Sequence, residues 1–272
     1  MAESPAVSSR QNPRFKAALA LRDARERRER RRLLVDGTRE IGRALDAGLD
    51  VVEAWVAPER VRSQGAGALL PRLRSAGAEL LTTTPALLGA LAYGDRDDGI
   101  VIVATEPATD LARLSLPERP LVAVVEQVEK PGNLGALMRS ADGAGVDAVI
   151  VADALCDPWN PNAIRASQGT LFSLPMAVCA STEALAWLRQ QGIAIVTARV
   201  DGKVDYDAVD LRGGVAIVVG AETTGLGTAW VGEDVTAVRI PMLGLADSLN
   251  VSASAAVLFY EARRQRRAAT GS

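Results

Sequence analysis

Residues 121–153 read LVAVVEQVEKPGNLGALMRSADGAGVDAVIVAD, and this stretch decides the fold class of the chain. Its first eight residues are almost all apolar, as in strands that are buried on both faces of a parallel sheet. A segment with helical character follows, and residues 146–153 then form a second apolar run of strand length. This strand–helix–strand unit predicts an α/β fold with a parallel sheet between helices.

The same alternation continues toward the carboxyl terminus. Further strands are expected at IAIVTARV (residues 193–200), VAIVVGAE (215–222) and VTAVRIPM (235–242), and a long helix is expected over residues 248–267. Five parallel strands with helices between them predict a doubly wound sheet, whose ligand usually lies at the carboxyl ends of the strands. The glycine fingerprint of dinucleotide-binding domains and the Walker A sequence are both missing, which excludes the ordinary Rossmann and P-loop functions.

Toward the amino terminus, strand and helix patterns alternate again over the first hundred residues and predict a smaller α/β domain. Three prolines interrupt the segment between the two patterns, and the first residues are polar. The predicted organisation is a flexible tail (1–14), a small domain (15–105), a linker (106–119) and a larger domain (120–268).

Composition narrows the chemistry. The chain has 272 residues, 48% of them hydrophobic, and it contains no histidine and two cysteines, Cys156 and Cys179. A Ser-His-Asp triad, a Cys-His pair and a histidine-ligated metal are therefore excluded, and two cysteines are too few for a structural zinc site. No apolar run reaches the roughly 20 residues that span a bilayer, and the first residues do not resemble a secretory signal. These features predict a cytoplasmic protein without a metal.

Positive charge is concentrated although the net charge is only −2. Leu21–Arg32 contains seven arginines and three acids, and four more arginines lie between Arg263 and Arg267. One interpretation is a solvated helix with acid–arginine pairs four residues apart, such as Glu26 and Arg30. The surplus of arginine also favours an anionic partner, and a localised basic surface of this kind indicates nucleic acid.

Polar residues follow two of the apolar strands in patterns that a simple turn does not explain. In residues 129–145, a Pro-Gly turn precedes Asn133, which is expected to cap the helix that carries Arg139. In residues 218–227, a buried strand runs into Gly220, Glu222 and a glycine-rich bend. Taken alone, each segment has an ordinary structural interpretation.

A third segment, IPMLGLADSLNVSASAAV (residues 240–257), contains Ser248 and Asn250 before the final helix, and Ser248 alone would be read as a helix cap. In order, the three segments contain N-x-G-x-x-x-R, G-x-E-x-x-G-L and I-P-M followed by S-L-N-V-S. They resemble the three signature motifs of the SpoU branch of the SPOUT methyltransferases. Residues 165–175, RASQGTLFSLP, are similar to another stretch of that family, and LLVDGTREIGRAL resembles its L30-like substrate-binding domain.

The resemblance implies S-adenosylmethionine-dependent 2′-O-methylation of a ribose in RNA. It implies a trefoil knot, formed by segments around 195–200, 218–227 and 240–250, and a homodimer built through the first and last helices of the catalytic domain. Main-chain atoms at Gly220, Ile240 and Leu249 would hold the adenosine part of the cofactor. An L30-like domain before the SpoU domain favours 23S ribosomal RNA as the substrate, including the enzymes that confer antibiotic resistance.

The resemblance also assigns roles at the reacting hydroxyl. Arg139 would activate the ribose 2′-hydroxyl, and because a guanidinium resists deprotonation, we expect it to position the hydroxyl and stabilise charge rather than act as a base. Asn133, Ser248 and Asn250 would orient the ribose and Arg139, and Glu222 would fix the loop geometry. Two alternatives remain open: a transfer RNA 2′-O-methyltransferase, and a non-catalytic RNA-binding protein of the same fold.

Overall fold

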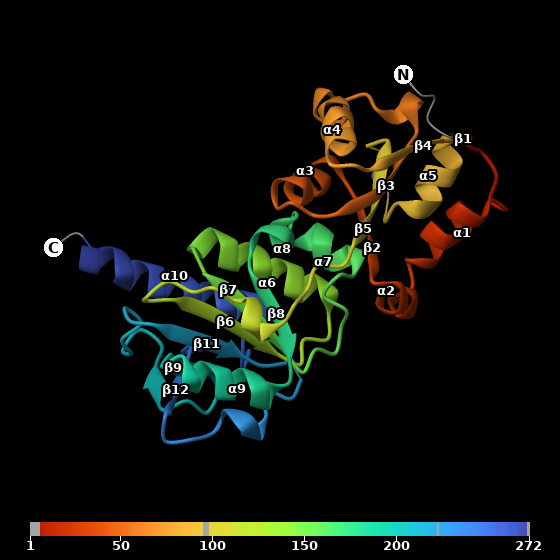
Figure 1. Ribbon diagram of the computed structural model, residues 1–272. Helices are drawn as coiled ribbons and strands as arrows, with labels where there is room; N and C mark the ends of the chain where they lie inside the picture. Colours follow the sequence, from red (N-terminus) through yellow and green to blue (C-terminus); the bar gives the residue numbers. More distant parts are fainter. Residues whose placement is uncertain (1–5, 95–97, 222, 271–272) are drawn as a thin grey trace. The chain divides into compact units, whose positions relative to one another are not determined.

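A computed structural model describes residues 6–94, 98–221 and 223–270, and the chain divides into two compact units (Figure 1). The first unit extends to Pro107 and also includes Trp159–Ser173. The second unit consists of Ala108–Pro158 and the chain from Leu174 onward. None of the described helices is long and apolar enough to cross a membrane.

The first unit is built on a five-stranded sheet. Its strands are β1 (Ala6–Val7), β2 (Arg32–Asp36), β3 (Val51–Val56), β4 (Glu79–Thr83) and β5 (Ile100–Thr105). They lie in the order β1-β4-β3-β5-β2, and β5 runs antiparallel to both of its neighbours. Its helices are α1 (Pro13–Ala20), α2 (Ala24–Arg30), α3 (Thr38–Asp46), α4 (Gln64–Ser75), α5 (Pro85–Leu91), α7 (Pro161–Ala166) and α8 (Thr170–Ser173), with a short 3-10 turn at Pro58–Arg60.

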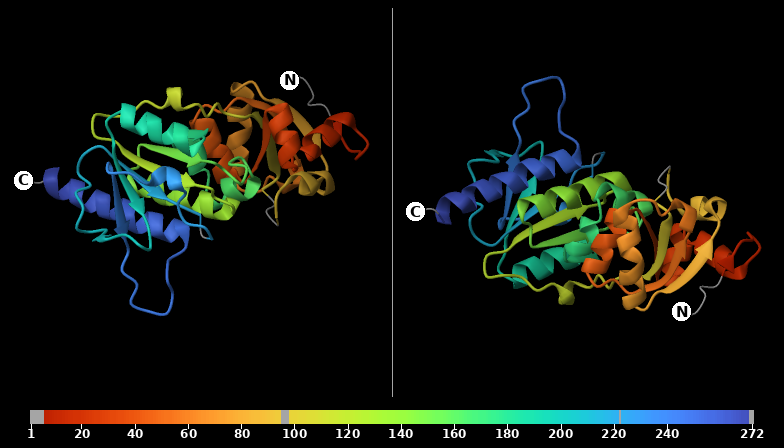
Figure 2. Two further views of the ribbon diagram at one scale, coloured as in Figure 1. Left: turned by 90° about the horizontal axis from the view of Figure 1, so that it is seen from below. Right: turned by 90° about the horizontal axis from the view of Figure 1, so that it is seen from above.

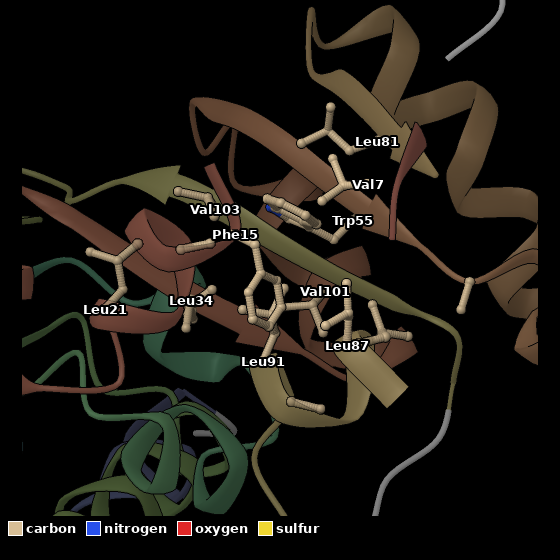
Figure 3. Packing of buried hydrophobic residues seen from close by; sticks show 14 residues of the cluster. Val7, Phe15, Leu21, Leu34, Trp55, Leu81, Leu87, Leu91, Val101 and Val103 are labelled. Carbon is tan, nitrogen blue, oxygen red and sulfur yellow. The ribbon is translucent and has the colours of Figure 1, made fainter. Parts of the chain in front are cut away.

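The core of this unit lies around an aromatic pair, Phe15 from α1 and Trp55 from β3 (Figure 3). The two rings meet edge to face with centroids 6.0 Å apart, and neither side chain is exposed. Such a pair contributes about 0.5–1.5 kcal/mol beyond the burial of its area. Val7 lies beside Trp55 and Leu81 in the same cluster.

The position of Val7 corrects the expectation of a flexible tail over residues 1–14, of which the structure describes residues 6–14. Ala6–Val7 pairs with β4, and Val7 is only 4% exposed. The polar composition of the segment hid one apolar residue whose burial fixes the strand. Asn12 then caps α1 by accepting from the backbone of Arg14 at 2.9 Å.

Trp159–Ser173 packs within the first unit although its sequence neighbours belong to the second. Arg43 donates to the carbonyl of Gln168 at 2.9 Å, and the Trp159 and Phe172 rings stack at 6.0 Å. Gly169 has a φ of +84°, and a Cβ there would lie 3.1 Å from the Glu40 backbone. The left-handed backbone, together with this close approach, explains why glycine is needed in the RASQGTLFSLP stretch.

The second unit is built on a seven-stranded sheet in which all registered pairs are parallel. Its order is β10-β12-β9-β11-β6-β7-β8. The five predicted strands are present, and the short edge strands β8 and β10 add to them. The strands are β6 (Leu121–Glu126), β7 (Ala148–Ala152), β8 (Met176–Cys179), β9 (Ala194–Ala198), β10 (Val204–Asp205), β11 (Val215–Val219) and β12 (Val235–Arg239).

Helices cover both faces of this sheet, as the doubly wound prediction requires (Figure 2). Helices α6 (Pro131–Ala144) and α10 (Val251–Thr270) pack side by side on one face, and α9 (Ser181–Gln190) lies on the other. Two 3-10 turns, Leu111–Arg113 and Thr228–Trp230, complete the unit. Part of the predicted linker is packed rather than free, because Leu111, Leu114 and Leu116 lie against the core on the α9 side.

The amino end of the seven-stranded sheet is held by one arginine of α10. Arg266 donates to four backbone carbonyls, at distances from 2.7 to 3.1 Å. Two of these carbonyls precede β6 and two precede β11, so one side chain ties the starts of both central strands to the last helix. The acceptors are Arg119, Pro120, Leu211 and Gly213.

Candidate active site

A cavity of about 750 Å³ lies at the carboxyl end of the seven-stranded sheet. It is formed where β9, β11 and β12 end, and its lining comes from residues 198–201, 219–221, 223–226, 239–242 and 247–249, with Val251 and Ser254 of α10. Parallel strands bring these segments together because all of their carboxyl ends lie at the same edge. The loop between β12 and α10 extends away from the sheet in Figure 2, and Leu243 and Leu245 on it are fully exposed.

The third motif leads into α10, and the helix cap is not Ser248, the residue that would be chosen if that serine were considered alone. The helix begins at Val251, and the side-chain oxygen of Asn250 accepts from the backbone N–H of Ser252 at 3.0 Å. Asn250 rather than Ser248 is therefore the cap, which leaves Ser248 exposed and lining the cavity. The Asn250 amide also donates to Oδ1 of Asn133 at 3.3 Å, which joins the third motif to the first.

The first motif corrects another expectation. Asn133 does not cap α6, because the helix already begins at Pro131, and Lys130 holds the cap position without a side-chain bond. Proline is well suited to the first helical position because its φ is already set. Asn133 therefore lies inside the first turn, and its side chain is directed to Asn250 instead. Arg139 lies farther along α6, exposed, outside the cavity and without a hydrogen bond or ion pair to the described residues.

The second motif forms a tight turn after β11. A Cβ at Gly220 would lie 2.4 Å from the backbone of Gly225, so no side chain fits there. Gly225 has a φ of +68°, and its N–H donates to the carbonyl of Ala221 at 3.0 Å. Glu222, predicted to fix this loop, lies outside the described residues. Its neighbour Thr223 donates to Glu129 at 3.1 Å, which ties the turn to the segment before α6.

Sequence reasoning missed a buried acid below this turn. Glu126, at the end of β6, is 1% exposed and accepts three hydrogen bonds. Ser181 and the Trp230 indole donate to Oε1 at 2.6 and 2.9 Å, and the backbone N–H of Gly227 donates to Oε2 at 2.6 Å. The signal was an acid at the end of an apolar run, similar to the signal that drew attention to Glu222.

The predicted residues that the structure describes are therefore placed in three ways, and Asn250 lines no cavity but is bonded to Asn133. Gly220, Ile240, Ser248 and Leu249 line the large cavity. Asn133 lines a small adjoining cavity of about 10 Å³ together with Gly220, Ala221 and Val251. Arg139 lines neither of them.

The cavity-forming unit matches a known family along most of its length. The profile of the SpoU rRNA Methylase family matches residues 120–260, which is more than half of the chain. The chain belongs to the SpoU rRNA methylase family. As a member, it is an RNA 2′-O-methyltransferase that uses S-adenosylmethionine. A second profile, the MRM3-like substrate binding domain, matches residues 12–102.

Several relatives of this SpoU methylase align over nearly the whole chain. The 23S rRNA (uridine(2479)-2′-O)-methyltransferase of Streptomyces viridochromogenes is 35% identical, over 96% of this chain and 92% of its own. The 23S rRNA (guanosine(2553)-2′-O)-methyltransferase RlmP of Bacillus subtilis is 26% identical, over 94% and 98%. The structure is similar to that of the SpoU methyltransferase AviRb from S. viridochromogenes in complex with AdoMet, with a TM-score of 0.87, 32% identity and coverage of 94% and 99%.

The arginine-rich segment of this SpoU methylase is used largely by the fold. Arg27 is 2% exposed and donates to the carbonyl of Leu21 at 2.7 Å. Arg28 is exposed and makes no hydrogen bond or ion pair with the described part of the chain. The others are engaged: Arg22 with the Tyr93 ring, Arg25 with Glu29, Arg30 with Glu26, Arg31 with Glu106 and Arg32 with Thr105. The count of arginines therefore overstates the charge available to RNA.

The two cysteines do not offer a nucleophile to the methylase. Cys156 and Cys179 are half-buried, and burial raises the pKa of each thiol to about 11. Both are protonated near neutral pH, which suits packing better than catalysis. No group of three or more cysteine, aspartate or glutamate side chains among the described residues is arranged to hold a metal ion.

Proposed function

We propose that this enzyme methylates the 2′-hydroxyl of one nucleotide of 23S ribosomal RNA in the cytoplasm. The observation that carries the proposal is the meeting of all three motifs at one end of the seven-stranded sheet, around a cavity that the cofactor fits. Both relatives described above are named as 23S enzymes, and they align with almost the entire chain. One is named for a uridine and the other for a guanosine, so the proposal stops at the RNA and does not name the base.

The large cavity suits S-adenosylmethionine in size and lining. Its volume of about 750 Å³ lies within the roughly 300–1,000 Å³ of small-molecule sites. Apolar side chains such as Ile240 and Leu249 offer surface for an adenine, and the tight turn at Gly220 exposes backbone groups for hydrogen bonds. We assign the adenosine part to these three positions. When bound, the cofactor supplies an electrophilic methyl group on a positively charged sulfur.

The side chains beside the cavity would prepare the ribose hydroxyl for attack. The linked amides of Asn133 and Asn250 offer a donor and acceptor pair that can orient the ribose, and exposed Ser248 can add a third group. Arg139 would stabilise the charge that develops on the hydroxyl oxygen as its proton leaves. Glu222 keeps its proposed role in fixing the loop.

We propose that the enzyme works as a homodimer through α6 and α10, with RNA lying across two subunits. Arg139 supports this arrangement, because it lies outside the cavity of its own chain and is exposed. We also propose that the segments around the cavity form the family's trefoil knot. The first unit, with its substrate-binding profile, would hold RNA through exposed residues such as Arg28.

A methylation assay tests the function directly. Purified protein is incubated with labelled S-adenosylmethionine and unmethylated 23S ribosomal RNA or transfer RNA. The modified nucleotide is then mapped by its resistance to alkaline cleavage, which needs a free 2′-hydroxyl. Label in 23S RNA at one alkali-resistant position is the expected result. Label in transfer RNA alone would support the transfer RNA alternative, and no label with intact RNA binding would support the non-catalytic one.

Antibiotic resistance is a further part of the proposal, because the modified site would lie in the RNA of the ribosome. Expression in a susceptible host should raise the inhibitory concentration of a ribosome-targeting drug whose site includes the mapped nucleotide. Unchanged susceptibility of a host whose 23S RNA is fully methylated would identify a housekeeping enzyme.

A further inference from the structure

Two buried polar side-chain atoms of the second unit have no hydrogen-bond partner, and they belong to residues only two positions apart in the sequence. They are Oγ1 of Thr197 and Nη1 of Arg199, and among the described residues of this unit no other buried side-chain nitrogen or oxygen lacks a partner. Thr197 lies near the end of β9, and Arg199 directly follows that strand and lines the cavity. Buried polar atoms are almost always satisfied, so two exceptions at one strand end require an explanation.

Arg199 is the exception that lines the cavity. Its Nε and Nη2 donate to the carboxylate of Asp201 at 2.9 and 3.3 Å, which holds one side of the guanidinium. Nη1 has no acceptor and no contact with solvent. Arg239, the other arginine of the lining, differs because it is half exposed and pairs with Asp205 at 2.7 Å. Arg199 therefore keeps one donor nitrogen uncommitted beside the cavity.

We propose that Arg199 binds the carboxylate of the methionine part of S-adenosylmethionine through Nη1. The cofactor carries one anionic group, that carboxylate, and a guanidinium is the side chain that matches a carboxylate best in charge and geometry. Because Nη1 is closed to solvent, the guanidinium must turn toward the cavity when the ligand enters. This turn breaks no hydrogen bond at Nη1, but it loosens the pair that Nε and Nη2 form with the exposed Asp201. The inference rests on the proposed placement of the cofactor in this cavity.

Calorimetric binding of two nucleosides tests the assignment without using catalysis. The first is S-adenosylhomocysteine, and the second is its decarboxylated analogue, in which an aminopropyl chain replaces the amino-acid chain. The wild-type protein should bind the first roughly tenfold or more tightly, the usual scale of a charge-assisted hydrogen bond. Arg199→Gln should remove this preference by weakening only the carboxylate-bearing ligand.

Two further variants make the result specific. Arg212→Gln is the matched control, because Arg212 also pairs with an aspartate two residues away, Asp210, but lies outside the cavity lining. It should retain the full preference. Arg199→Lys keeps the charge but lacks the planar fork, so it should retain part of the preference. Thermal melting of each variant confirms that the protein tested is folded.

The possible failures are distinguishable. If wild-type protein binds S-adenosylhomocysteine but Arg199→Gln keeps the preference for the carboxylate, the assignment of Arg199 is overturned and the proposed function stands. If Arg199→Gln instead weakens RNA binding alone, Arg199 contacts a phosphate and the assignment is again overturned. If wild-type protein binds neither nucleoside, the proposed function itself fails.

Discussion

Arginine side chains differ in their hydrogen bonding between the two ends of the seven-stranded sheet. At the amino end, Arg266 donates to four carbonyls and joins α10 to the starts of β6 and β11. At the carboxyl end, Arg199 leaves one nitrogen without an acceptor. On α6, which begins at that end, Arg139 has no partner among the described residues. The same side chain can thus complete the fold or remain available to a ligand, and only its hydrogen bonds distinguish the two cases.

Arg139→Ala is expected to produce the largest effect on activity. Turnover should fall roughly a hundredfold or more, the scale for loss of one electrostatic group in the transition state. Cofactor affinity should change little, because Arg139 does not line the cavity. Single-turnover methyl transfer and calorimetry measure the two quantities. Arg139→Lys should restore little activity. A folded Arg139→Ala protein with a near wild-type rate would show that Arg139 is an ordinary surface residue.

Arg266→Ala should show the opposite pattern at the amino end. It leaves several carbonyls without their donor, so we expect the free energy of unfolding to fall by about 2 kcal/mol. The turnover of the protein that remains folded should not change. Urea unfolding beside a rate measurement tests this, with Arg264→Ala as the control. Arg264 is 65% exposed and pairs with Glu261, so its loss should cost under about 1 kcal/mol. A larger cost for Arg264 than for Arg266 would contradict the comparison.

Glu126→Gln tests whether a side chain at the carboxyl end can also serve the fold. This buried acid lies at that end, yet both of its carboxylate oxygens accept hydrogen bonds. A glutamine has one acceptor oxygen, so either Gly227 or the Trp230 indole faces an amide N–H instead of an acceptor. We expect a loss of about 1–2 kcal/mol in stability and several-fold weaker cofactor binding, because the turn at Gly227 adjoins the cavity.

The double variant Glu126→Gln with Trp230→Phe provides a rescue. Removing the indole donor lets the amide group face Ser181 and its oxygen face Gly227, so cofactor affinity should recover although a buried side chain has been shortened. If cofactor affinity does not recover in the double variant, the bond from Gly227 to residue 126 does not position the loop.

Two neighbouring arginines of α2 extend the comparison to the first unit. Arg28→Gln should leave stability within about 0.5 kcal/mol but weaken RNA binding, with the slope of log affinity against log salt falling by about 1. Arg27→Gln should reduce stability, because Arg27 is buried and bonded to backbone carbonyls, and should leave the salt slope unchanged. Filter binding of 23S RNA over a range of salt distinguishes the two. An equal effect of both variants on the slope would refute the separation of roles.

The smallest expected effect is on the pH dependence of the free energy of unfolding, through Asp210 near the amino end of the seven-stranded sheet. Arg212 lowers the pKa of Asp210 to about 2, mainly through a side-chain hydrogen bond. Because the folded pKa lies below the ordinary value of about 3.9, this carboxylate stabilises the fold above pH 4 and loses that contribution as the pH falls toward 2. The difference in stability between wild type and Asp210→Asn should therefore be constant above pH 5 and shrink below pH 4. A constant difference down to pH 2 would contradict this account.

The sequence predicted the second unit well because its strands are apolar runs of a type that buried parallel sheets require. Its motifs also indicated the cavity, since the ends of parallel strands meet at one edge. The predicted cap of α6 was wrong for a local reason, because Pro131 begins α6 two residues before Asn133. At α10 the cap is Asn250, so the interpretation of Ser248 as an ordinary cap does not hold. The polar composition of the first residues gave a wrong prediction for β1, because the burial of one residue, Val7, is enough to hold the strand in the sheet.

Long-range contacts set the limit of what a sequence pattern can show. The local sequence around Glu126 does not predict that its hydrogen-bond donors are Ser181, Gly227 and Trp230. The packing of Trp159–Ser173 in the first unit is equally hidden, because it depends on partners such as Arg43 that lie more than a hundred residues earlier.

The inclusion of Trp159–Ser173 in the first unit has a consequence for synthesis on the ribosome. The first unit is not complete when its own five strands have emerged, because α7 and α8 are still to be made. The hydrogen bond from Arg43 to the carbonyl of Gln168 cannot form until that residue has been synthesised. The same holds for the packing of Gly169 against the backbone of Glu40. Domains usually fold one after the other as the chain emerges. Here β6, α6 and β7 of the second unit leave the ribosome before the first unit can finish, so part of the second unit is already exposed while the first is still incomplete.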